Sequence, residues 1–152
     1  MLPVGLIIKF LYLKNSLLKK IMLITLEGAK EKYHFSLTNF CIMPNHIHLL
    51  IKPKEGTCLS NIMQWIKTRS AKRLNTIYRT KDHLWGERFF SRPVQTFMDY
   101  EYVMNYIDQN PVEAKIVSSP AEWEASGAFH KTHNIPDLID YFSPEKLHRI
   151  KL

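Results

Sequence analysis

The chain has 152 residues, which is the size of one compact domain that folds without a disulfide or metal staple. A hydrophobic fraction of 45% and a charged fraction of 23% exclude a disordered tail, a collagen-like rod and a coiled coil, and two cysteines are too few for a disulfide scaffold. The net charge of +7 is uneven, at +4 over residues 1–50, +6 over 51–100 and −3 over 101–152, so the positive field that suits a phosphate-bearing partner belongs to the first hundred residues.

The longest apolar run covers residues 4–13. It is interrupted by Lys9 and is much shorter than the roughly 20 residues that span a bilayer. It also lacks the basic start and the small-residue cleavage site of a secretory signal. We therefore expect a cytoplasmic protein with no membrane partner.

The first half of the chain predicts one strand, one helix and one hairpin. Residues 4–13 are rich in β-forming side chains and predict a strand. Residues 17–33 show a loose amphipathic pattern, which predicts a helix that ends near Tyr33. Two runs of alternating apolar residues, 35–42 and 46–51, are separated by Met43-Pro44-Asn45, which is typical of a β-hairpin.

The second half predicts a helix, a strand and another helix. Apolar residues recur at helical spacing over residues 59–79, and the aromatic and β-branched run 84–97 predicts a strand. The next helix is expected to begin at Asp99 as N-cap and to stop at Asn110, because a proline follows and cannot continue the hydrogen-bond ladder.

The order of these elements predicts an α+β fold. A four-stranded antiparallel sheet with two helices on one face, as in ferredoxin-like and RRM-like folds, accounts for the order strand, helix, strand, strand, helix, strand. The last helix follows this unit. We expect a domain over residues 1–117 and a C-terminal extension over 118–152, where prolines favour an irregular path with short helical pieces.

His46 and His48 are a candidate metal pair. Residues two apart on a strand point to the same face of the sheet, so both imidazoles can converge on one divalent ion. The alternative is a pair without a metal role, because seven histidines in a chain of this length often produce such a spacing by chance.

Tyr106 and Asn110 are a second candidate pair. They are four residues apart on a predicted helix, so the phenol and the amide lie on one helix face and can meet at one site. The alternative is that Tyr106 belongs to the core stripe of an amphipathic helix, together with Tyr102, Val103 and Ile107.

Basic and aromatic side chains cluster in the middle of the chain. Arginines beside exposed aromatic rings suit single-stranded nucleic acid, because bases stack on the rings while cations contact phosphates. The alternative is a core strand flanked by solvated arginines. The candidate phosphate-binding residues are Lys67, Arg69, Lys72 and Arg73 on the helix over 59–79, and Arg88 and Arg92 on the following strand.

Three separated motifs resemble one family. The strings MPNHIHLLI (43–51), HLWGERFF (83–90) and YIDQNPVEAKIV (106–117), in this order and spacing, resemble the REP-associated tyrosine transposases. These are small insertion-sequence transposases with a His-hydrophobe-His motif. The similarity covers about residues 16–130.

The resemblance implies a single-strand DNA endonuclease and strand transferase that acts beside DNA hairpins. It implies that His46, His48 and Asn110 hold Mg²⁺ or Mn²⁺, and that Tyr106 is the nucleophile that forms a 5′-phosphotyrosine. The partner would be single-stranded or hairpin DNA, and the protein would be associated with the nucleoid when bound to it. The long C-terminal extension resembles the branch that works as a monomer, whereas shorter relatives work as dimers.

The N-terminus departs from the family pattern. Residues 1–16 offer an apolar stretch with almost no loop, so we expect the first strand to be altered or lost. The rival interpretation is therefore a relic that grips hairpin DNA without cutting it. A structural zinc protein is disfavoured because neither cysteine lies at a plausible spacing from the histidines.

Overall fold

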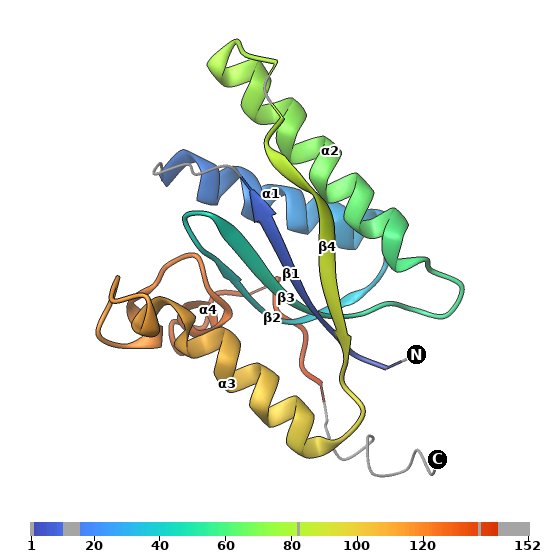
Figure 1. Ribbon diagram of the computed structural model, residues 1–152. Coiled ribbons are helices and arrows are strands. Elements are labelled where there is room, and N and C mark those ends of the chain that lie inside the picture. Colours follow the sequence, from blue (N-terminus) through green and yellow to red (C-terminus); the bar gives the residue numbers. More distant parts are fainter. Residues whose placement is uncertain (1, 11–15, 82, 137, 143–152) are drawn as a thin grey trace.

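Four antiparallel strands and three long helices make up most of the computed structural model, which describes residues 2–10, 16–81, 83–136 and 138–142 (Figure 1). In chain order the elements are β1 (Val4–Phe10), α1 (Ser16–Tyr33), β2 (Ser36–Ile42), β3 (His46–Lys52), α2 (Leu59–Tyr78), β4 (Trp85–Pro93), α3 (Phe97–Glu113), the short 3-10 helix η1 (Pro120–Glu122) and α4 (Gly127–Thr132).

The strands form one sheet in the order β2-β3-β1-β4. Helices α1 and α2 pack against each other on one face of the sheet, and α3 lies on the opposite face (Figure 1). This arrangement confirms the predicted α+β fold with two helices on one face and a separate helix that carries Tyr106.

The expectation that the first strand is lost is wrong, and the strand predicted to begin at residue 4 is present. Strand β1 is complete over Val4–Phe10 and lies inside the sheet, where it pairs with both β3 and β4. The strand forms because alternate side chains along it are apolar and point into the core, where Leu6 and Ile8 are fully buried. The end of the predicted strand, residues 11–13, lies outside the described residues.

Helix α3 begins earlier and ends later than the sequence predicts. The N-cap is Thr96, whose Oγ1 accepts a hydrogen bond from the Asp99 N–H at 3.1 Å. The helix also continues through Pro111 to Glu113. A proline costs a helix one backbone hydrogen bond, and in the last turn few bonds remain to be disrupted. Strand β4 ends at Pro93 rather than at residue 97.

The segment after α3 covers the outer edge of β2. The Trp123 Nε1 donates to the Ile42 carbonyl at 3.0 Å, and the Ile42 N–H donates to the Ala125 carbonyl at 2.9 Å. Cys41 forms an isolated bridge with Ser126. These bonds occupy backbone groups of an edge strand that would otherwise be open to pairing. The predicted short helical pieces are η1 and α4.

Within the part of the chain that the structure describes, no helix is both long and apolar enough to cross a bilayer.

We expect Trp123→Ala to lower the free energy of unfolding by about 3–5 kcal/mol, because a buried indole and its hydrogen bond to β2 are lost together. Urea unfolding measures the change. Ile116→Ala, at a side chain that is 40% exposed, is the control and is expected to change stability by less than about 0.5 kcal/mol. A similarly small change for Trp123→Ala would show that this segment does not stabilise the sheet.

Candidate active site

The two predicted metal histidines lie at the start of β3 and face α3. Their ring centroids are 4.7 Å apart with the planes at 87°. His48 pairs in the sheet with Cys41 of β2 on one side and with Ile7 of β1 on the other. The alternating neighbour Ile47 is fully buried, in the core. The sheet therefore holds both imidazoles on the face opposite α1 and α2.

Helix α3 brings the other two candidates to the same place. The Tyr106 ring lies 5.3 Å from the His48 ring, nearly perpendicular to it, and Asn110 Oδ1 lies 3.2 Å from His46 Nε2. Because the two α3 residues are one turn apart, both face the histidine pair. The structure thus gathers all four predicted residues into one cluster.

Burial keeps the histidines neutral. Desolvation, followed by the charge of His46, lowers the pKa of His48 to about 4, and this side chain is only 2% exposed. Burial is also the main cause that lowers the pKa of His46, with a smaller contribution from Lys9 and an opposing one from its bond to Asn110. A neutral imidazole is the form that can ligate a metal ion.

The contacts of His46 leave a site suited to a cation. Its Nδ1 lies 2.6 Å from Asn45 Oδ1, and its Nε2 faces Asn110 Oδ1. A neutral imidazole carries one N–H, so only one of these two ring nitrogens donates and the other carries a lone pair. That lone pair faces an amide oxygen, and a cation between the two acceptors would satisfy both.

His48 and the surrounding residues agree with such a site. The Nε2 of His48 is buried and has no hydrogen-bond partner among the described residues. No group of three His, Cys, Asp or Glu side chains in those residues could hold a metal ion, so the third protein donor would be the amide of Asn110. Two imidazoles and one amide oxygen leave further positions open, which fits a divalent ion with oxygen ligands from a substrate.

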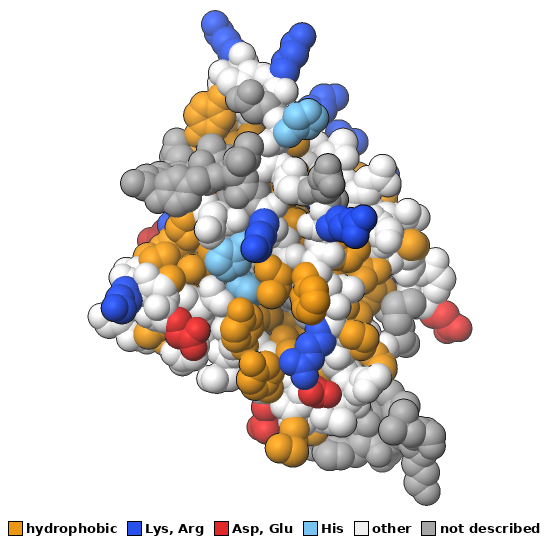
Figure 2. Space-filling view, in the orientation of Figure 1, with side chains coloured by type: hydrophobic (Ala, Val, Ile, Leu, Met, Phe, Trp, Pro, Cys, Tyr) orange, Lys and Arg blue, Asp and Glu red, His pale blue; other side chains and the backbone are white. Residues whose placement is uncertain are grey.

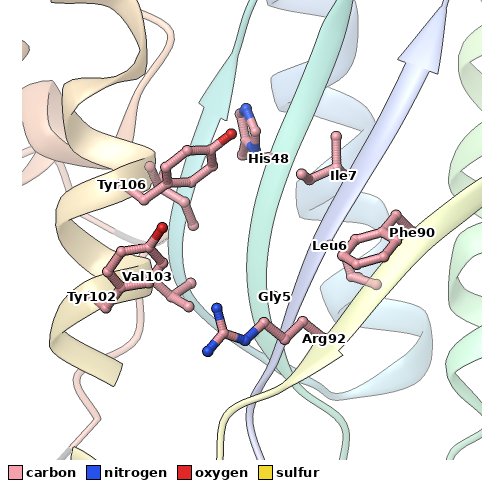
Figure 3. Close-up of a pocket in the computed structure, with 10 residues that line it drawn as sticks. Gly5, Leu6, Ile7, His48, Phe90, Arg92, Tyr102, Val103 and Tyr106 are labelled. Carbon is pink, nitrogen blue, oxygen red and sulfur yellow. The ribbon is translucent and has the colours of Figure 1, made fainter. Parts of the chain in front are cut away.

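A pocket of about 240 Å³ adjoins the cluster (Figure 3). It lies over β1 between β4 and α3, and Figure 2 shows histidine side chains beside a group of hydrophobic ones on this face. Its lining is mainly apolar and aromatic and includes two cluster members, His48 and Tyr106. The remaining lining residues are Gly5, Leu6, Ile7, Phe90, Arg92, Tyr102, Val103 and Ile107.

Of the predicted phosphate-binding residues, the structure brings Arg92 to this pocket. Its Nη2 forms an ion pair with Asp99 Oδ1 at 2.9 Å, and its guanidinium carbon lies 5.5 Å from the centre of the Tyr102 ring. Arg88 is exposed on the same strand, β4, at the edge of the sheet.

The four basic residues of α2 lie on the other side of the sheet from Tyr106. Arg73 Nη1 donates to Thr25 Oγ1 of α1 at 2.8 Å, and Lys67 Nζ donates to the Gly86 carbonyl at 2.6 Å. Arg69 lies 5.6 Å from the centre of the Trp65 ring, and Lys72 is exposed. Their part in DNA binding stays a prediction.

Sequence reasoning missed the places of Asn45 and Tyr102 beside the cluster. Asn45 was interpreted only as a turn residue, although its place directly before His46 allows a side-chain contact. Tyr102 was weighed as core, but it is 60% exposed, and its ring stacks at 6.3 Å on that of Tyr106. An exposed aromatic ring one turn before the candidate nucleophile is the signal that could have found it.

The family model described as "Transposase IS200 like" matches residues 9–110. A Haemophilus influenzae protein named as a REP-associated tyrosine transposase is 27% identical over 111 residues, which are 66% of this chain and 62% of that protein. The chain thus spans less than two thirds of that relative.

Solved structures share the fold. That of a REP-associated tyrosine transposase bound to a REP hairpin has a TM-score of 0.76 at 20% identity and covers 94% of this chain and 90% of its own. A structure from Deinococcus radiodurans, assigned as a transposase, has a TM-score of 0.54 at 17% identity and covers 71% and 89%.

We expect His48 to make stability depend on pH. Its pKa is about 4 when folded and about 6.5 when unfolded, so the unfolded chain binds more protons between these values. Above pH 6.5 the contribution of neutral His48 to the free energy of unfolding is fully present. It is lost as the pH falls to 4, and the loss amounts to about 3 kcal/mol. Metal-free urea unfolding from pH 7 to 4 measures this loss.

His48→Leu should show a smaller loss of stability over that range, and His83→Gln, at an exposed histidine, should behave as the unchanged protein does. Equal pH dependence in His48→Leu and the unchanged protein would contradict the assignment of this titration to His48.

Proposed function

The chain belongs to the IS200-like transposase family, and from this membership we propose that it cuts and rejoins single-stranded DNA beside hairpins through Tyr106. The observation that carries the proposal is the position of the Tyr106 ring, 5.3 Å from the ring of His48 and on the same helix face as Asn110. A tyrosine beside a pair of neutral imidazoles suits a metal-assisted phosphoryl transfer to a phenol.

The proposed reaction exchanges one phosphate ester for another. The Tyr106 phenol loses its proton, and its oxygen attacks the scissile phosphorus in line. The bond from phosphorus to the 3′ oxygen breaks, and that oxygen takes up a proton and leaves as a 3′-hydroxyl. The 5′-phosphotyrosine conserves the energy of the bond, so attack by another 3′-hydroxyl rejoins the DNA without ATP.

His46, His48 and Asn110 would hold the Mg²⁺ or Mn²⁺ ion that the family resemblance implies. When bound, the ion would polarise the scissile phosphate and orient it. The protein's own part is to supply neutral ligands. Burial keeps both imidazoles neutral, and the Asn45 amide oxygen contacts Nδ1 of His46 at 2.6 Å, which orients the ring.

Tyr106 is accessible to a DNA strand. The side chain is 37% exposed, while Val103 and Ile107 on the adjoining stripe of α3 are buried. The helix is therefore anchored by its aliphatic residues and presents the phenol at the surface. A strand can reach the hydroxyl without any opening of the core.

One chain supplies every part of the proposed centre. The histidines of β3 and the tyrosine of α3 face each other within the same molecule. This supports a monomer as the active form. The rival interpretation, a relic that only binds hairpins, loses the support that a missing first strand would give it, because β1 is present between β3 and β4.

We expect purified protein to form an SDS-stable adduct with labelled single-stranded hairpin DNA from the repeats that flank its gene, in the presence of Mg²⁺ or Mn²⁺. Tyr106→Phe should abolish the adduct, because it removes the nucleophilic oxygen. His48→Ala or a chelator should reduce it at least about 100-fold, since phosphate activation is lost.

Tyr141→Phe is the matched control, because this tyrosine is 93% exposed and lines a different pocket from that of Tyr106, and the adduct should persist. Tight hairpin binding by folded protein without an adduct would contradict the enzyme proposal and leave the DNA-binding relic.

We also propose that exposed arginines contact phosphates of the hairpin, as the neighbour with a bound REP hairpin suggests. Arg88→Ala should weaken binding for all sequences and lower the slope of log affinity against log salt by about 1. Lys20→Ala, at an exposed lysine of α1, removes the same charge elsewhere and should leave the slope unchanged. Arg69→Ala tests α2. Equal slopes for Arg88→Ala and Lys20→Ala would contradict a contact at β4.

A further inference from the structure

The pocket beside Tyr106 has aromatic walls on two sides. Phe90 projects from β4 on one side, and Tyr102 and Tyr106 project from α3 on the other, with β1 between them (Figure 3). Phe90 is 65% exposed and Tyr102 is 60% exposed. Large aromatic rings are seldom left this open without a partner, so both sides of the pocket offer flat surfaces for stacking.

Gly5 lies at the floor of the pocket, and because it has no side chain the pocket is deeper there. A Cβ atom at Gly5 would lie 3.3 Å from Val103 Cγ1, which is tighter than an ordinary contact. The glycine therefore lets α3 approach β1 closely. Leu6 and Ile7 continue the floor, and the volume of about 240 Å³ is smaller than the roughly 300–1,000 Å³ of pockets for drug-sized ligands. One planar group fits this space better than a larger ligand.

Arg92 places hydrogen-bond donors at the pocket. Asp99 accepts from Nη2, and the Tyr102 ring lies beside the guanidinium, so two contacts fix its position. A guanidinium carries five N–H donors in a fixed plane, and the bond to Asp99 uses one of them. The remaining donors suit the acceptor atoms at the edge of a nucleobase.

We propose that this pocket is a subsite for the base of one unpaired nucleotide that flanks the scissile phosphate. The inference rests on the proposed function, because His48 and Tyr106 line the same pocket and place its occupant next to the reacting groups. Aromatic walls favour a base over a phosphate or a sugar, since every base has a π-face. The base stacks on the exposed ring of Phe90, with Tyr102 at the opposite wall, and Arg92 donates to its edge.

Binding without chemistry tests the subsite. In Tyr106→Phe protein, each unpaired nucleotide of the hairpin substrate is replaced in turn by an abasic nucleotide, and the Kd is measured. We expect one flanking position to lose about 5- to 100-fold in affinity. When Phe90→Ala is added, the loss at that position should be smaller by about threefold or more, because groups in contact are coupled.

Two further variants serve as controls. Phe90→Tyr keeps an aromatic wall and should restore the full loss at that position. Met98→Ala removes a side chain that is 79% exposed and does not line the pocket, so the abasic profile should stay as it was.

The same profile with and without Phe90→Ala, or a profile with no sensitive position, would overturn the subsite even if the unchanged protein forms its adduct. A coupled position in a protein that forms no adduct would remove the proposed cleavage and keep the base-binding pocket. The two proposals therefore fail separately.

Discussion

The placement of α3 against the sheet is the constraint on which the site depends. Asn39 of β2 is fully buried, and its Nδ2 donates to Asp108 Oδ1 of α3 at 2.7 Å. Asp108 lies midway in sequence between Tyr106 and Asn110, on nearly the opposite side of a helix with 3.6 residues per turn. Fixing Asp108 toward β2 therefore sets the rotation of α3 that directs Tyr106 and Asn110 at the histidines.

Burial serves two purposes at once in the histidine cluster. Removing His48 from water makes its protonated form unfavourable, which lowers its pKa to about 4 and leaves a buried nitrogen without a partner. An unsatisfied polar atom costs stability in an ordinary core. In the proposed metal site the lone pair of this nitrogen would bind the ion, so a bound cation would remove the local defect.

The sequence predicts the elements better than their ends or their relative placement. The His-x-His spacing and the one-turn separation of Tyr106 and Asn110 were sufficient to predict which side chains meet in the cluster. Strand and helix periodicity decide which side chains share a face. The proline rule failed at Pro111, because a helix with only two residues left loses little by continuing. Helical periodicity showed that Arg69 is exposed, but it carries no information on which face of the sheet α2 covers.

The two edges of the sheet differ in how far other segments cover them, and this difference determines from which side the site is open. The edge at β2 is covered by the segment around Trp123, and α3 packs mainly on the neighbouring strands β2 and β3. The half of this face formed by β1 and β4 carries the pocket, with Arg88 exposed on the edge strand. Tyr106 thus lies at the border between the covered and the open half. A DNA strand that reaches its hydroxyl would approach across β4, which carries Arg88, Arg92 and the exposed ring of Phe90.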